Sequence, residues 1–165
     1  MIRHAGLIAL RLDGRWTGAL IEGPSGIGKS DLAMRALEVG FRLVADDQTL
    51  VWASGGEVYG RAPGALFGLI EVRGHGIMAE SPLAFARVAL RARCVPDGIP
   101  IERVPDPAAE VIAGIPLPTL VLRPREPSAP AKLRRAIEYL GAAAQQAYLP
   151  TSLGGPGRAG TGDTP

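Results

Sequence analysis

A glycine-rich segment carrying one lysine and one serine is the part of the sequence best suited to chemistry. It reads Gly23-Pro24-Ser25-Gly26-Ile27-Gly28-Lys29-Ser30 and matches Gly-x-x-x-x-Gly-Lys-Ser at every fixed position. In such a loop the backbone N–H groups point at a phosphate, the lysine reaches the terminal phosphates and the serine hydroxyl can ligate Mg²⁺. An apolar strand pattern precedes the loop and a helical pattern from Ser30 to Val39 follows it. The sequence therefore predicts a nucleotide or polyphosphate site rather than a plain turn.

Two adjacent carboxylates follow the next apolar segment. Asp46 and Asp47 come directly after Phe41–Ala45, which we predict as a buried strand. In open α/β sheets, ligands bind beyond the carboxyl ends of the strands, which is where these acids fall. They are either a solvated turn or a functional pair, in which one binds Mg²⁺ and the other accepts a proton.

A second polar cluster lies further along the chain between small residues. Glu71 and Arg73 alternate on a segment that we expect to be extended, so both side chains should face one way. They form either a surface salt bridge or a metal ligand with a phosphate clamp. From the pattern alone, His4 and His75 are interpreted as surface residues.

Length and composition indicate one compact domain. The chain has 165 residues, of which 47% are hydrophobic and 21% charged, and its net charge is +2. Because no long basic run is present, we expect no nucleic-acid partner. Neither a signal peptide nor an apolar run long enough for a membrane span is found, so the expected location is cytoplasmic. Cys94 is the only cysteine and is interpreted as a core residue.

The periodic patterns predict alternating strands and helices, hence an α/β fold. We expect a folded domain over residues 1–150 and a disordered Gly/Pro-rich tail over 151–165. The predicted strands are Leu7–Leu12, Trp16–Glu22, Phe41–Ala45, Thr49–Ala53, Glu57–Arg61, Leu83–Val95 and Thr119–Leu122, and the predicted helices are Ser30–Val39 and Ala131–Tyr148.

Three blocks together resemble the catalytic domain of HPr kinase/phosphorylase. They are the glycine-rich loop with Asp31-Leu32-Ala33, then Arg42-Leu43-Val44-Ala45-Asp46-Asp47, then Leu69-Ile70-Glu71-Val72-Arg73-Gly74-His75-Gly76-Ile77. The resemblance covers roughly residues 3 to 79. It implies a P-loop kinase core with a mixed β-sheet, similar to phosphoenolpyruvate carboxykinase, followed by a C-terminal helix.

The resemblance also implies an activity and its residues. The family consists of serine kinases that use ATP and Mg²⁺ to phosphorylate HPr, the carrier protein of the phosphotransferase system, and many members also catalyse phosphorolysis. Carried over by position, Asp46 is the general base, Arg73 stabilises the transferring charge, and His4 matches a functional histidine. The metal residues are Ser30, Asp47 and Glu71, and Lys29 with the loop amides holds the phosphates.

This sequence departs from the longer family members in two places. It begins almost at His4 and so resembles a short, alphaproteobacterial form lacking the N-terminal domain, and no Gly-Arg-Asn loop is found. Homo-oligomerisation is left open. Two other functions also stay open: a P-loop module that senses nucleotide without catalysis, and a kinase or carboxykinase-like enzyme acting on a small molecule.

Overall fold

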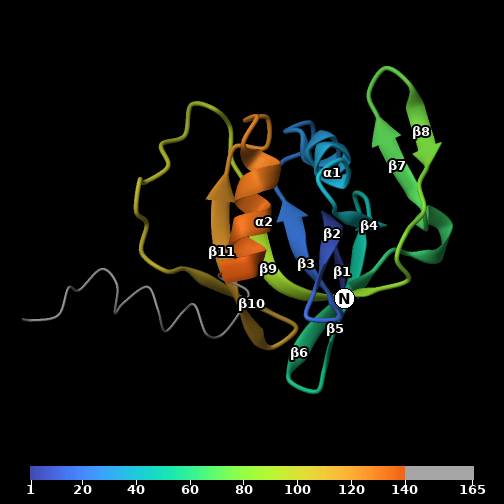
Figure 1. Ribbon diagram of the computed structural model, residues 1–165, viewed down its shortest axis with the longest axis horizontal. Helices are drawn as coiled ribbons and strands as arrows, with labels where there is room; N and C mark the ends of the chain where they lie inside the picture. Colours follow the sequence, from blue (N-terminus) through green and yellow to red (C-terminus); the bar gives the residue numbers. More distant parts are fainter. Residues whose placement is uncertain (140–165) are drawn as a thin grey trace, which may run out of the picture.

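The computed structural model describes residues 1–139 of the chain. The predicted tail over 151–165 and the last part of the predicted helix, residues 140–148, lie outside the described residues. Within the described part, a nine-stranded mixed sheet carries two α-helices, and a separate two-stranded hairpin projects from the body (Figure 1).

The elements follow one another along the chain as strands with two helices inserted. They are β1 (Ile2–Arg3), β2 (Ala5–Leu12), β3 (Arg15–Glu22), α1 (Lys29–Leu37), β4 (Arg42–Ala45), β5 (Thr49–Ser54), β6 (Glu57–Arg61), a 3₁₀ turn η1 (Gly64–Leu66), β7 (Leu69–Val72), β8 (Gly76–Ala79), β9 (Ala86–Cys94), β10 (Ala109–Ile112), β11 (Ile115–Leu122) and α2 (Ala129–Tyr139). Neither helix of the described part is long and apolar enough to cross a membrane.

The large sheet curls back on itself. Seven of its strands follow the order β1-β5-β6-β9-β3-β2-β4, and the β10–β11 hairpin joins them through the pairing of β11 with β9. Strands β1 and β2 are separated in the chain by a single residue, His4. The two strands are therefore neighbours in the chain, although β5, β6, β9 and β3 lie between them in the strand order. Since β2 is antiparallel to both β3 and β4, the carboxyl ends of β3 and β4 lie at the same edge. His4 lies at that edge as well, because it directly precedes β2, whose first residue Ala5 pairs with Glu22 at the end of β3.

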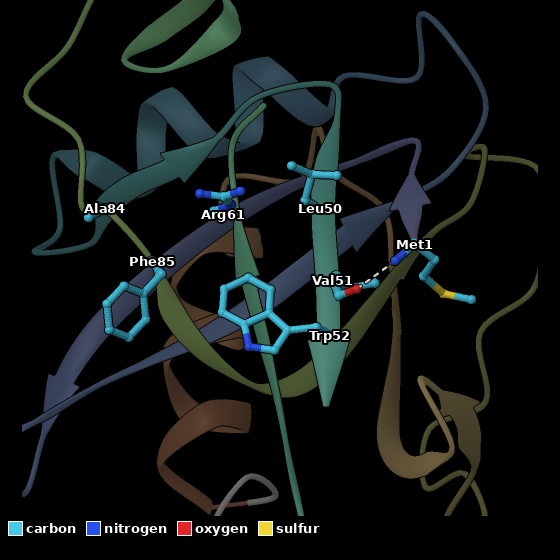
Figure 2. Close-up of a pocket in the computed structure, with 7 residues that line it drawn as sticks. All are labelled: Met1, Leu50, Val51, Trp52, Arg61, Ala84 and Phe85. Atoms are coloured by element: carbon cyan, nitrogen blue, oxygen red, sulfur yellow. Dashed lines mark hydrogen bonds between the residues drawn. The ribbon is translucent and has the colours of Figure 1, made fainter. Parts of the chain in front are cut away.

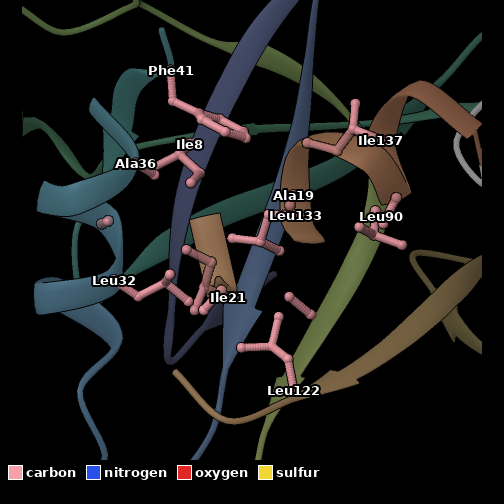
Figure 3. Packing of buried hydrophobic residues seen from close by; sticks show 14 of the residues in the cluster. Ile8, Ala19, Ile21, Leu32, Ala36, Phe41, Leu90, Leu122, Leu133 and Ile137 are labelled. Carbon is pink, nitrogen blue, oxygen red and sulfur yellow. The ribbon is translucent and has the colours of Figure 1, made fainter. Parts of the chain in front are cut away.

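Two apolar cores fill the two faces of the curled sheet. One core packs α1 and α2 against the sheet, with Leu32 and Leu133 from the helices meeting Ile8, Ile21 and Leu90 from the strands (Figure 3). The other core fills the opposite face with side chains from β2, β3, β4, β5, β6 and β9, closed by the β10–β11 hairpin. In β2 and β3, alternating residues feed the two cores, so a one-residue register shift would exchange them.

Most predicted elements are confirmed, and the differences have physical reasons. The segment between residues 96 and 130 holds the hairpin β10–β11, whereas the sequence predicted only Thr119–Leu122 as a strand. Pro116 and Pro118 argued against a strand in the sequence, because proline cannot donate a backbone hydrogen bond to a neighbouring strand. They are tolerated in β11 because β9 pairs with β11 only from Thr119 onward. Helix α2 begins at Ala129, two residues earlier than predicted. The lone cysteine Cys94 is buried in the core, as expected.

A glycine permits the close approach of β2 and β3. A Cβ added to Gly18 would lie 2.7 Å from the backbone oxygen of Ile8 and 3.0 Å from Cδ1 of Leu7, both fully buried. We expect Gly18→Ala to lower the free energy of unfolding by about 2 kcal/mol, because two paired strands would have to separate. Urea denaturation measures this change. Gly64→Ala is the matched control, since nothing lies within 4 Å of its added Cβ, and equal loss in both variants would contradict the expectation.

Candidate active site

The glycine-rich loop connects the carboxyl end of β3 to the amino end of α1. Gly28 is the N-cap of α1 with a φ of 112°, a left-handed conformation that favours glycine. Gly23 packs against β9, where an added Cβ would lie 2.9 Å from both Cβ and O of Cys94. The predicted strand–loop–helix context is confirmed. The first N–H groups of α1 are available to an anion at this position.

The Lys29 side chain lies back over its own loop. Its Nζ donates hydrogen bonds to the backbone oxygens of Gly23 at 2.9 Å and Pro24 at 3.1 Å, and the residue is buried. The ammonium group is thus held inside the loop by carbonyl groups, which a phosphate oxygen could replace as its partners.

Asp46 is the point at which the three sequence blocks meet. Its Oδ1 accepts a hydrogen bond from Ser30 Oγ at 2.8 Å, and its Oδ2 accepts one from the backbone N–H of Glu71 at 2.9 Å. The residue is only 7% exposed. Burial raises the pKa of Asp46 above its usual value, although both hydrogen bonds act in the opposite direction. The structure therefore joins the end of β4, the start of α1 and β7 through one carboxylate.

Asp47 points to a different side of the chain from Asp46. Its φ is 65°, a left-handed conformation that aspartate tolerates better than most residues. Its Oδ1 lies 3.3 Å from Nδ1 of His4, and both side chains are about half exposed. His4 lies here because β2 begins beside the end of its antiparallel neighbour β4, so the structure brings together two predicted site residues that are 43 positions apart.

The remaining predicted residues lie on the projecting hairpin β7–β8. Strand β7 ends at Val72, so Arg73 falls in the turn, and the expectation that Glu71 and Arg73 alternate along one extended segment is wrong at this point. Both residues are exposed, and neither side chain makes a hydrogen bond or ion pair within the described residues. The chain reverses at Arg73-Gly74-His75, where Gly74 adopts a φ of 90° that favours glycine.

The oxygen donors of this edge are of the kind that Mg²⁺ prefers. Ser30, Asp46, Asp47 and Glu71 supply a hydroxyl and carboxylates, which are hard ligands. Over residues 1–139, no group of three or more His, Cys, Asp or Glu side chains is already gathered as a metal site. The donors therefore suit Mg²⁺ in type, while the predicted metal set stays a prediction.

Two features near the loop escaped the sequence-based prediction. Arg125, from the segment between β11 and α2, donates from Nη2 to the backbone oxygen of Gly26 at 3.1 Å and so crosses the loop. The second feature is an ion-pair network around Glu22, the residue before the loop. No local pattern links these partners, because up to 107 positions separate them in the chain.

The network holds Glu22 between two arginines. Its carboxylate accepts hydrogen bonds from Arg3 Nε at 2.5 Å and Arg91 Nε at 2.6 Å, and Glu110 contacts both arginines at 2.8 and 3.0 Å. Burial by itself would raise the pKa of Glu22, but the hydrogen bonds from Arg3 and Arg91 outweigh it and lower the pKa overall. The network fixes the strand end from which the loop departs.

The Glu22 network predicts a specific loss of stability in acid. A carboxyl with a lowered folded-state pKa stabilises the fold above its unfolded pKa, about 4.3, and loses that contribution as the pH falls through the folded value. We expect Glu22→Gln to lower the free energy of unfolding at pH 7 by about 2 kcal/mol. We also expect the difference from the wild type to shrink below pH 4. Denaturation at several pH values tests both statements, with the exposed Glu102→Gln as control. A constant difference at all pH values would refute the assignment.

Comparison with known proteins places this geometry in a family. Residues 7–89, about half of the chain, match the model of the HPr serine kinase C-terminal domain. Over 66 residues the chain is 47% identical to an HPr kinase/phosphorylase of Clostridium perfringens and 48% identical to one of Clostridium kluyveri. These alignments cover 40% of this chain and 22% and 21% of the two relatives, so the match spans about a fifth of their length.

A solved structure confirms the fold. The chain is similar to the Hpr(Ser) kinase/phosphatase of Coxiella burnetii, with a TM-score of 0.72 and 22% identity, covering 92% of this chain and 99% of that one. The expected mixed-sheet kinase core with a C-terminal helix is therefore correct. From the matched residues 7–89, which contain the loop, Asp46 and Glu71, it follows that the chain belongs to the HPr serine kinase C-terminal domain family.

Proposed function

We propose that this protein is a serine kinase that transfers a phosphoryl group from ATP, with Mg²⁺, to the carrier protein HPr. The observation that carries the proposal is the convergence at Asp46, which accepts hydrogen bonds from Ser30 of the phosphate loop and from the backbone of Glu71. A loop alone would support any nucleotide-binding function. A buried carboxylate bonded to that loop adds a group able to take a proton.

The phosphate groups of ATP fit the loop and the start of α1. Backbone N–H groups at this helix end favour an anion, and the Lys29 ammonium lies within the same loop. Binding would replace the contacts of Lys29 with Gly23 and Pro24 by contacts with phosphate oxygens. Arg125, which crosses the loop at Gly26, would lie beside the bound phosphates.

The Mg²⁺ ion has suitable donors at the same edge. Ser30, Asp47 and Glu71 are the proposed ligands, and a bound Mg²⁺ would neutralise charge on the phosphates and orient them. Ser30 lies in the first turn of α1, Asp47 follows the end of β4, and Glu71 lies on β7 with its backbone N–H bonded to Asp46. Their oxygens satisfy the preference of a hard cation, which supports the proposal.

Asp46 is the proposed acceptor of the serine proton. Burial raises its pKa, which makes the carboxylate a better base than an exposed aspartate. Its two hydrogen bonds fix both oxygens, so the carboxylate is oriented before the substrate arrives.

Arg73 is proposed to stabilise the transferring charge from the β7–β8 turn, and His4 is proposed to orient Asp47 through their 3.3 Å contact. This function places the protein in the cytoplasm, and the same groups acting in reverse would support phosphorolysis.

The decisive experiment is incubation of the protein with ATP, Mg²⁺ and purified HPr, followed by phosphopeptide mapping. Phosphoserine on HPr supports the proposal. Nucleotide binding without phosphoserine would instead indicate a sensor, and transfer to a metabolite with HPr unmodified would indicate a small-molecule kinase. Lys29→Ala distinguishes true transfer from a contaminant, because the same preparation should then lose the activity.

The role of Asp46 predicts a separation of binding from turnover. We expect Asp46→Asn to reduce kcat by about 10²-fold or more while the Kd for ATP changes by only several-fold. Asparagine fits the site, since its oxygen can accept from Glu71 N–H and its amide can donate to Ser30 Oγ. Asp106→Asn, in an exposed loop, is the control. Parallel losses of binding and rate would make Asp46 a ligand-binding residue rather than a base.

A further inference from the structure

One side of the β5–β6 hairpin faces away from both cores and is rich in apolar and aromatic side chains. In register across the strands, Ile2 of β1 pairs with Leu50 of β5 and Leu50 pairs with Arg61 of β6, while Trp52 pairs with Tyr59. Paired residues share a face, and alternate residues of a strand do so as well. With Phe85, which precedes β9, these residues form what we call the aromatic strip: Ile2, Leu50, Trp52, Tyr59, Arg61 and Phe85.

Three rings give the aromatic strip a fixed shape. Trp52 stacks on Tyr59 with ring centroids 5.9 Å apart and an interplanar angle of 22°, and Phe85 meets Trp52 at 6.5 Å and Tyr59 at 6.2 Å. A shallow pocket of about 520 Å³ opens between Leu50, Trp52, Arg61 and Phe85 (Figure 2). The cluster is thus ordered before any partner binds, which reduces the entropy lost on association.

The aromatic strip is apolar yet open to solvent. Ile2 is 64% exposed, Phe85 55% and Trp52 37%. Phe85 lies beside Trp52, and Ile2 continues the strip on β1 by pairing with Leu50. Scattered apolar residues are normal on a surface, but a contiguous patch with several aromatic rings marks an interaction site. Tryptophan and tyrosine are also the residues that most often dominate binding energy at protein interfaces.

The aromatic strip starts at the catalytic edge. Ile2 is two residues from His4, and Leu50 is three residues from Asp47, a distance of at most about 10 Å along an extended chain. His4 and Asp47 form the half-exposed, open side of the proposed active site. A protein whose serine reaches Asp46 from this side would extend over β1 and β5.

The charges of the aromatic strip define its partner. Arg61 lies between Leu50 and Phe85 (Figure 2), and it makes no hydrogen bond or ion pair with any residue of the described part. Glu57, which begins β6 on the same face, is already bonded to Arg15, Arg87 and the hydroxyl of Tyr59. The aromatic strip itself contains no carboxylate. A fitting partner therefore presents apolar side chains together with one carboxylate aimed at Arg61.

We propose that the aromatic strip docks the phosphoacceptor protein, through an apolar surface of that protein that carries a carboxylate opposite Arg61. This inference rests on the proposed kinase function and adds the surface that selects its protein substrate. A second copy of this chain fits less well, because a two-fold contact would bury two Arg61 guanidinium groups while Glu57, the acid bordering each strip, is already paired with Arg15 and Arg87.

Two variants test the docking surface with HPr as the acceptor. Phe85→Ser removes an exposed ring, and Arg61→Glu reverses the unpaired charge. We expect each variant to raise the Kd and the KM for HPr about tenfold, while kcat and the KM for ATP stay within about twofold, because the strip does not contact the phosphates. Arg61→Lys should retain most of the affinity. Val104→Ser, at another exposed apolar position, is the control, and thermal melts establish that every variant folds.

The outcomes separate this inference from the function it rests on. An unchanged KM and Kd for HPr in both folded variants would overturn the docking surface while leaving the kinase intact. If sedimentation shows that the wild type is an oligomer and that Phe85→Ser has a lower mass, the docking surface is overturned in favour of a contact with a second copy of this chain. If the wild type binds HPr through the strip but forms no phosphoserine, the docking surface stands and the kinase function fails. If the wild type neither binds nor phosphorylates HPr, both proposals fail.

Discussion

The Asp46 carboxylate is the interaction on which the site depends. A buried charge is costly unless it is paired or hydrogen-bonded, and Asp46 meets this need with one hydroxyl from the start of α1 and one N–H from β7. Those donors come from segments 16 residues before it and 25 residues after it in the chain. The bonds therefore tie the phosphate loop, the end of β4 and the projecting hairpin to one point. The raised pKa of Asp46 reflects the part of the burial cost that these bonds do not remove.

Antiparallel pairing explains why distant residues share one edge. Because β2 runs antiparallel to both β3 and β4, His4 at the start of β2 lies beside the ends of those two strands. Gly18 allows the close approach of β2 and β3, and the Glu22 network fixes the end of β3 where the loop begins. The core that packs the two helices against the sheet includes no residue of β5 or β6, and the outer side of these two strands carries the aromatic strip instead.

The sequence predicted the features that local patterns encode. The phosphate loop, the β2–β3 and β5–β6 hairpins and the strand before Asp46 were all correct, because turn residues and apolar periodicity act over a few positions. Strand β10 and the length of β11 were missed, since two prolines in β11 are harmless only where β9 does not pair with it. The Glu22 network and Arg125 depend on contacts between distant segments, which no local pattern reports. The roles of the predicted site residues stay predictions, although the structure gathers His4, Ser30, Asp46 and Asp47 at one edge.

Adjacent aspartates can take different roles only if the backbone turns between them. In a regular strand, Asp46 and Asp47 would simply face opposite sides of the sheet, and the second would point into a core or away from the phosphates. The left-handed φ of Asp47 ends the strand instead, so Asp46 faces Ser30 in a buried position while Asp47 faces His4 in the open. Burial raises the pKa of Asp46, which suits it to the proposed proton transfer, while the half-exposed Asp47 is open to a ligand. Asp47 also marks the side from which the proposed protein substrate would enter, and that side leads directly onto β1, β5 and the aromatic strip.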